Sequence, residues 1–126
     1  MKVIITGCTG FIGGGVLAQC VEHPSITSIL VLTRRDIGRW AEHSKVQAIT
    51  VEDFTAYDNA TIRELQTADA ALWCLGTKTG DKRTDIDFPL TFISHLKARP
   101  AGSPLFRFVQ LSGAFTEPPQ IGRAHV

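Results

Sequence analysis

The feature that most constrains the fold of this chain lies at its start, where a run of β-branched residues meets a series of glycines. The run Val3–Thr6 predicts a strand that is buried on both faces, as strands of parallel sheets are. Gly7, Gly10 and Gly13 follow it and open an apolar helical segment. We therefore predict a strand, a tight turn and a helix at the beginning of the chain.

Each of these glycines has its own physical role. Gly7 permits the sharp turn off the strand, Gly10 lets a pyrophosphate approach the backbone with no Cβ in the way, and Gly13 lets the helix pack against the strand. The free N–H groups and the positive dipole end at the helix start then favour phosphate. Glycine loops without ligands are common, but the strand and helix on either side favour dinucleotide binding over an unliganded structural turn.

Length and composition limit the alternatives. A chain of 126 residues can form one domain with a core but is short for a complete dinucleotide-binding enzyme. A net charge of +1 gives no reason to expect nucleic acid or a membrane as partner. Cys8, Cys20 and Cys74 show no CxxC pairing, so they predict neither a disulfide framework nor a metal site. With no transmembrane-length run and no signal peptide in the sequence, we expect a cytoplasmic protein.

The rest of the chain alternates between strand and helix patterns. Further strands are predicted at Ser28–Thr33, Lys45–Val51, Ala70–Leu75 and Leu105–Leu111. Helices are expected from the glycine loop to His23–Pro24, from Asp58 to about Thr67 and from Asp87 to Pro100, with a short helix or loop at Ile37–Ser44. Right-handed crossovers then give an α/β doubly wound parallel sheet (Rossmann) of five strands in the order 3-2-1-4-5, incomplete at the C-terminus. The expected domain covers residues 1–117, and an irregular tail covers 118–126.

The tip of the second strand carries Arg34 and Arg35, followed by Asp36. In a dinucleotide site, an acidic residue at this tip accepts a hydrogen bond from a free ribose 2′-hydroxyl, whereas arginines accommodate a 2′-phosphate. The arginine pair therefore favours NADP as the cofactor, and Asp36 leaves NAD as an alternative. The alternative is that both arginines only solvate a strand end.

The switch point of the predicted sheet lies between the first and fourth strands, which places Gly7–Gly13 and Leu75–Thr77 on facing sides of one crevice. The polar segment Lys78–Thr84 is expected to be a mobile loop beside that crevice, where a phosphate contact is the alternative to a solvated surface. Tyr57, the only tyrosine of the chain, is followed four residues later by Thr61 rather than lysine. We therefore predict a packing role for Tyr57.

At this point the residues resemble a known family. The segment Thr6-Gly7-Cys8-Thr9-Gly10-Phe11-Ile12-Gly13 resembles the TGxxGxxG loop of extended and atypical short-chain dehydrogenases/reductases, a group that includes sugar-nucleotide epimerases and NmrA-like proteins. The segments Leu32–Arg35, Cys74–Thr77 and Phe108–Gly113 are similar to the Tat-interacting-protein-like branch. The likeness covers residues 2 to about 117.

The resemblance implies a role for each matching position, with NADP as cofactor and NAD as the alternative. The pyrophosphate would be lined by Thr9, Gly10, Phe11 and Ile12, between the shaping glycines Gly7 and Gly13, and the 2′-phosphate by Arg34 and Arg35. Asp53 and Phe54 would meet the adenine, whereas Leu75, Gly76 and Thr77 would flank the nicotinamide-side ribose. Ser112 matches the serine that holds the substrate carbonyl or hydroxyl in the family's enzymes.

The sequence also departs from the family. Its enzymes use a tyrosine and a lysine, spaced YxxxK after the fifth strand, for the acid–base step, and the segment after Ser112 contains neither residue type. We therefore predict cofactor binding with little hydride transfer; the alternatives are a non-catalytic nucleotide-sensing or protein-interaction module, or a truncated product. An incomplete sheet would expose Leu72, Cys74, Phe106 or Phe108, depending on strand parity, and we expect an oligomer or a protein partner to cover that face.

Overall fold

The computed structural model describes residues 1–75 and 82–110, which form a five-stranded parallel sheet. Its strands are β1 (Lys2–Thr6), β2 (Ser28–Thr33), β3 (Val46–Thr50), β4 (Ala70–Trp73) and β5 (Arg107–Gln110). They lie in the order β3-β2-β1-β4-β5, and each neighbouring pair is parallel. The predicted doubly wound α/β topology is confirmed.

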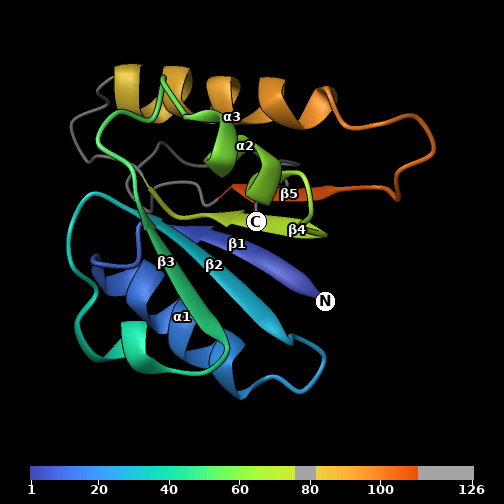
Figure 1. Cartoon of the computed structure of the whole chain (residues 1–126). Coiled ribbons are helices and arrows are strands. Elements are labelled where there is room, and N and C mark those ends of the chain that lie inside the picture. The colour runs from blue at the N-terminus through green and yellow to red at the C-terminus, as the bar shows by residue number, and fades with distance from the viewer. Residues whose placement is uncertain (76–81, 111–126) are drawn as a thin grey trace, which may run out of the picture.

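Helices cover both faces of the sheet (Figure 1). On one face lie α1 (Phe11–Glu22) and the short 3-10 helix η1 (Gly38–Glu42), and on the other lie α2 (Asn59–Leu65) and α3 (Phe88–Lys97). A π-helical turn, η2 (Arg83–Asp87), runs directly into α3. This division follows from right-handed crossovers, because the chain moves across the sheet in opposite directions on either side of β1.

Alternate residues of the strands pack with residues of the helices and of the segment after β3 in two apolar layers. One layer faces α1 and contains Val3, Ile5, Leu17, Cys20, Ile29 and Val31. The other faces α2 and α3 and contains Ile4, Leu30, Leu32, Phe54, Trp73 and Phe92. Because both faces are covered, β2 is buried at every position except Ser28, which explains why its sequence is a continuous apolar run.

The ends of two helices follow the local signals of the sequence. The Asp58 carboxylate accepts a hydrogen bond of 2.7 Å from the Thr61 N–H and so caps α2, as predicted. The hydrogen bonds from Thr61 lower the pKa of Asp58. Helix α1 ends at Glu22, before His23 and Pro24, since proline cannot continue a helix.

Several predicted limits need correction. Strand β3 covers Val46–Thr50 and is one residue shorter at each end than the predicted Lys45–Val51. Strand β4 ends at Trp73 rather than Leu75, since the next two N–H groups bond to a side chain of β1 instead of a neighbouring strand. Strand β5 begins at Arg107 rather than Leu105, because pairing with the β4 side starts with the Arg107 N–H bonded to the Asp69 carbonyl. Arg83 and the residue after it belong to η2 and not to a loop. The rest of the predicted loop up to residue 81, and residue 111, lie outside the described residues.

Two aromatic residues pack on opposite apolar layers, and Tyr57 has its predicted packing role. Trp40 of η1 packs against the apolar layer on the α1 face. Tyr57 packs on the opposite layer, edge-on to the rings of Phe54 and His95, and burial raises its pKa. Among the helices in the described ranges, none is both long enough and apolar enough to cross a membrane.

Candidate nucleotide-binding site

The corner between β1 and α1 is held by two glycines that the packing of the protein itself requires. Gly7 has φ +77°, in the left-handed region, and a Cβ there would lie 2.6 Å from the Cys74 carbonyl carbon. At Gly13 a Cβ would lie 1.9 Å from the Gly7 carbonyl oxygen. Neither backbone can move away without opening the corner, so both positions exclude any side chain.

Gly10 is different, because nothing in the described chain crowds it. A Cβ at this position would meet only the Gly7 carbonyl oxygen, at 3.4 Å. Gly10 is the N-cap of α1, and its extended backbone (φ −84°, ψ 168°) is open to any residue. Packing within the protein therefore gives no reason for a glycine here, whereas close approach of a ligand to the backbone would.

The start of α1 is open and lacks a compensating negative charge. Thr9 and Gly10 are exposed, Phe11 is 96% exposed and Ile12 is 49% exposed. The first turn of α1 contains no acidic residue. The positive end of the helix dipole and the free N–H groups of the first turn thus face outward, an arrangement suited to an anion.

A pocket of about 150 Å³ lies at the carboxyl ends of β1 and β2. Its described lining residues are Gly7, Cys8, Thr9, Leu32, Thr33, Arg34, Arg35, Phe54 and Leu75. The structure therefore brings together the glycine loop, the arginine pair and the end of the β4 segment, which the sequence places far apart. Burial raises the pKa of the Cys8 thiol to about 12, so this side chain adds no negative charge beside the loop.

The arginine pair follows a turn that Thr33 fixes. The Thr33 hydroxyl accepts a hydrogen bond of 3.0 Å from the Arg35 N–H and donates one of 2.8 Å to the Arg35 carbonyl. Arg34 and Arg35 are both exposed, and neither forms a salt bridge with any residue in the described ranges. The Asp36 carboxylate, in contrast, accepts a hydrogen bond of 2.7 Å from the Gly38 N–H and so is engaged within its own turn.

Thr6 is a site residue that sequence reasoning missed. Its side-chain oxygen is fully buried and accepts hydrogen bonds from the N–H groups of Cys74, at 3.2 Å, and Leu75, at 3.3 Å. One side chain thus ties the end of β1 to the end of β4, the two walls of the expected crevice. The available signal was a hydroxyl residue at the end of an otherwise apolar buried strand.

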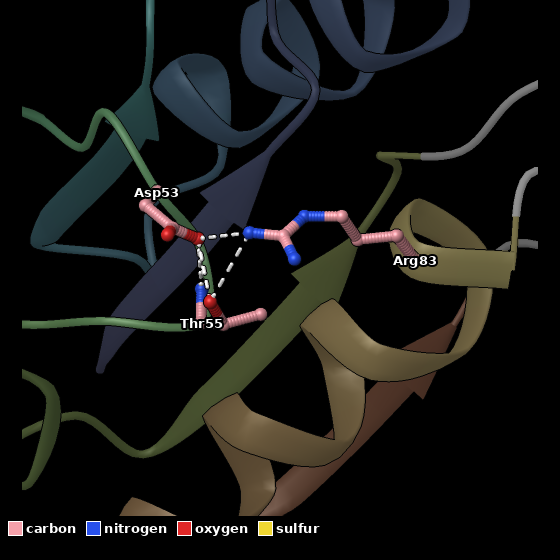
Figure 2. A network of polar contacts seen from close by, with 3 residues as sticks. All are labelled: Asp53, Thr55 and Arg83. Carbon is pink, nitrogen blue, oxygen red and sulfur yellow. Dashed lines mark hydrogen bonds and ion pairs between the residues drawn. The ribbon is translucent and has the colours of Figure 1, made fainter.

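Asp53 and Phe54, predicted to meet the adenine, point in different directions. The Asp53 side chain is partly exposed and bonds to Thr55 and Arg83 (Figure 2). Phe54 is 1% exposed, with its ring stacked on Phe88 and edge-on to Trp73. The Phe54 ring thus anchors this segment in the core, and Phe54 also lines the pocket, so its expected contact with adenine stays a prediction.

The remaining predicted residues are not placed. Gly76, Thr77 and Ser112 lie outside the described residues, as does Lys78. In the two ranges that the structure describes, no group of three or more His, Cys, Asp or Glu side chains could hold a metal ion.

The sequence is similar to two curated proteins that are longer than this chain. No family model matches it. It is 30% identical over 118 residues to the leucinostatins biosynthesis cluster protein T of Purpureocillium lilacinum, covering 89% of this chain and 42% of that protein. It is 27% identical over 124 residues to the protein FMP52, mitochondrial, of Candida albicans, covering 94% of this chain and 54% of that protein. The chain thus spans about half the length of the curated relatives it matches.

Solved structures share its architecture. The PhqB reductase domain from Penicillium fellutanum superposes with a TM-score of 0.73 at 16% identity, over 98% of this chain and 40% of that one. A UDP-glucuronic acid 4-epimerase from Bacillus cereus in complex with NAD gives 0.69 at 17% identity, over 94% and 43%. A short-chain dehydrogenase/reductase from Burkholderia vietnamiensis gives 0.59 at 18% identity, over 90% and 63%. The chain therefore has the doubly wound fold of this group of reductases, dehydrogenases and epimerases.

Proposed function

We propose that this chain is an NADP-binding protein of the short-chain dehydrogenase/reductase type. The observation that carries the proposal is the corner at Gly7–Gly13. Two of its glycines are required by packing, whereas Gly10 stands uncrowded at an open helix start. A dinucleotide pyrophosphate seated on the N–H groups at the start of α1 gives Gly10 its reason, because a side chain there would occupy the place of the phosphates.

The preference for NADP rests on the residues that follow β2. Arg34 and Arg35 are exposed, border the pocket and have no salt-bridge partner among the described residues. Two guanidinium groups in this position suit the 2′-phosphate of NADP. Asp36, the residue that would favour NAD, instead bonds to the backbone of its own turn.

The other assignments belong to the same proposal. The Asp53 carboxylate accepts a hydrogen bond from the adenine amino group, and Thr9, Phe11 and Ile12 line the pyrophosphate through their backbone. Leu75, Gly76 and Thr77 flank the second ribose, and Ser112 binds the substrate carbonyl or hydroxyl. A bound nicotinamide would supply the hydride, whereas the residues of this chain bind and orient the dinucleotide.

The proposal includes cofactor binding but little catalysis. The sequence after Ser112 contains neither tyrosine nor lysine, so the acid–base pair that the family resemblance implies is missing from this chain. We propose that the 126-residue chain binds NADPH but transfers little hydride. Steady oxidation of NADPH by the purified chain with a carbonyl substrate, at an ordinary enzymatic rate, would contradict this.

Calorimetric titration tests the binding proposal. The chain is titrated with NADPH and NADH, and we expect NADPH to bind more tightly. Arg34→Ala and Arg35→Ala should each weaken NADPH by about tenfold while leaving NADH nearly unchanged, as loss of a charge-assisted phosphate contact predicts. Arg39→Ala is the matched control, since Arg39 is an exposed arginine of η1 that does not line the pocket. Equal affinities for both nucleotides would refute the NADP assignment, and no binding of either would refute the function.

A second candidate function is a non-catalytic module that binds another protein. One observation favours it: an apolar groove of about 310 Å³ beside α1, lined among the described residues by Val16, Gln19, Cys20, Leu72, Trp73, Cys74 and Val109. Of the residues that an incomplete sheet could expose, Leu72 and Cys74 line this groove, whereas Phe106 and Phe108 pack on the opposite layer. Analytical ultracentrifugation and pull-down from a cell extract test this candidate together: a concentration-independent monomer that captures no protein partner would count against it.

The cytoplasmic location stays a prediction. The Candida albicans relative is described as mitochondrial, so fluorescence imaging of the tagged chain in its own cell type is the measurement that checks it.

A further inference from the structure

A polar network joins the segment after β3 to the turn before α3 (Figure 2). Nη2 of Arg83 lies 3.0 Å from Oδ1 of Asp53 and 3.4 Å from the Thr55 hydroxyl oxygen. The same Asp53 oxygen accepts hydrogen bonds from the Thr55 N–H, at 2.9 Å, and the Thr55 hydroxyl, at 2.6 Å. Three donors from two segments, 30 residues apart in the sequence, thus converge on one carboxylate oxygen.

An aromatic stack lies beside this network and fixes Arg83 from a second side. The rings of Phe54 and Phe88 stack with centroids 5.4 Å apart, and the Arg83 guanidinium lies 5.5 Å from the centroid of the Phe88 ring. Phe54 and Phe88 are both buried. The π-helical turn of η2 sets Arg83 directly ahead of α3, and turns of this type are frequent at functional sites. The guanidinium is therefore held by an ion pair and by a ring face together.

These contacts also define what Asp53 can do. Oδ1 receives all three donors, which restricts rotation of the carboxylate and leaves Oδ2 as the oxygen that none of them uses. Hydrogen bonds from Thr55 and the charge of Arg83 lower the pKa of Asp53, so the group is ionised at neutral pH. An ionised carboxylate only accepts hydrogen bonds. It therefore attracts an amino group and repels a carbonyl oxygen presented in the same place.

We propose that Arg83 is a positioning residue that orients the Asp53 carboxylate to select a 6-amino purine over a 6-oxo purine at the adenine end of the site. The inference rests on the proposed contact between Asp53 and adenine. It adds a residue from the other half of the chain to that contact and assigns it a part in base specificity. Arg83 itself need not touch the nucleotide for this role.

The test compares NADPH with its hypoxanthine counterpart, in which a carbonyl replaces the adenine amino group and all phosphates are unchanged. The unaltered chain should prefer the adenine form by about tenfold, the usual scale of one mismatched polar contact. In Arg83→Gln the preference should shrink to about threefold, in proportion to the modest strength of an exposed ion pair. Asp53→Asn, whose amide both donates and accepts, should abolish the preference.

Lys82→Gln is the matched control. It removes one positive charge at the neighbouring position, where the side chain is 77% exposed and lies 3.9 Å from Asp87 rather than beside Asp53. We expect it to leave the preference unchanged. A second readout needs no nucleotide: the pKa of Asp53, followed by NMR, should rise in Arg83→Gln yet stay below its usual range, because Thr55 still donates to the carboxylate.

The possible results distinguish failure of the proposed function from failure of this inference. If the unaltered chain binds neither nucleotide, the proposed function fails and the inference with it. If it binds NADPH but Arg83→Gln keeps the full preference, only the inference is overturned. An equal loss in Lys82→Gln would show a general charge effect and also overturn it. Should Arg83→Gln lower the melting temperature strongly, Arg83→Lys keeps the charge near Phe88 without the planar fork, and an intermediate preference is then required.

Discussion

Strands β2 and β5 are both parallel strands of one sheet, yet they differ in how the chain covers them. In β2 only Ser28 is not buried, whereas in β5 only Phe108 is not exposed. Strand β2 lies between β1 and β3, whereas β5 pairs with β4 at the end of the described sheet. Strand β2, which leads into the arginine pair, is thus covered by the protein's own packing, whereas the edge strands β3 and β5 both carry exposed residues. At β5 the sheet lies open along the groove beside Val109.

The protein is packed most tightly where the backbone of the proposed phosphate site is anchored. Phosphate-binding backbone has to be held in one conformation before the ligand arrives, and packing on both faces of β1 and β2 provides this.

Gly13→Ala should have the largest effect. Its Cβ would lie 1.9 Å from the Gly7 carbonyl oxygen, and because both partners are backbone of a packed corner, we expect a loss of at least about 3 kcal/mol in the free energy of unfolding. Gly15→Ala is the control on the same helix, where nothing lies within 4 Å; it should stabilise the protein by about 0.5–1 kcal/mol. Urea unfolding followed by circular dichroism measures both, and similar values for the two would contradict the geometry of the corner.

One substitution made on each strand compares β2 and β5 directly. Val31 of β2 is 0% exposed and Val109 of β5 is 38% exposed. Val31→Ala should cost about 2–3 kcal/mol of unfolding free energy, through lost burial and a cavity, and Val109→Ala less than about 1 kcal/mol. An equal loss of unfolding free energy at both positions would contradict this difference, since it would mean that β5 is as well supported as β2.

Gly10→Ala should separate binding from folding. The new Cβ meets only one protein atom, at 3.4 Å, so the free energy of unfolding should change by no more than about 1 kcal/mol, the scale of an N-cap substitution. NADPH affinity should fall by at least about tenfold, because the methyl group occupies the proposed phosphate position. Unchanged affinity, measured by calorimetry, would remove the observation on which the proposed function rests.

The smallest effect is expected at the N-cap of α2. The pKa of Asp58 is lowered from its ordinary 3.8 in the folded chain, so its charge stabilises the fold above that pH, and the contribution is lost as the pH falls through the folded-state pKa. Asp58→Ala should therefore melt at a lower temperature than the unaltered chain at pH 7, and the gap should narrow below about pH 4. Asp58→Asn retains a capping acceptor without the charge, so the difference in melting temperature between Asp58→Asn and Asp58→Ala should not change with pH. If the difference between the unaltered chain and Asp58→Ala also did not change with pH, the role of the charge would be contradicted.

Local patterns predicted much of this fold. The apolar run Ser28–Thr33 gave the limits of β2 without correction, and Asp58 marked the start of α2. Strand order was expected from the doubly wound fold that the alternation of strands and helices predicts, without knowledge of individual contacts. The limits of β2 and the start of α2 each depend on residues close together in the sequence.

The features that sequence reasoning missed depend on distant partners. Nothing near Asp53 predicts that Arg83 will reach it, and nothing near Phe54 predicts which rings it will pack against. The aromatic neighbours of Phe54 come from β4 and from the start of α3, so only the assembled sheet decides. Placement of Gly76, Thr77 and Ser112 stays a prediction from the family resemblance.

The Thr6 hydroxyl has a consequence for how tightly any nucleotide could be held. Because this one oxygen accepts from the first two N–H groups after β4, the course of the backbone on that wall is set when the protein folds. The entropy of ordering the wall is then lost before the ligand arrives, and association does not have to overcome it. A Thr6→Val protein, similar in shape but without the acceptor, would be expected to bind more slowly and with a more unfavourable binding entropy.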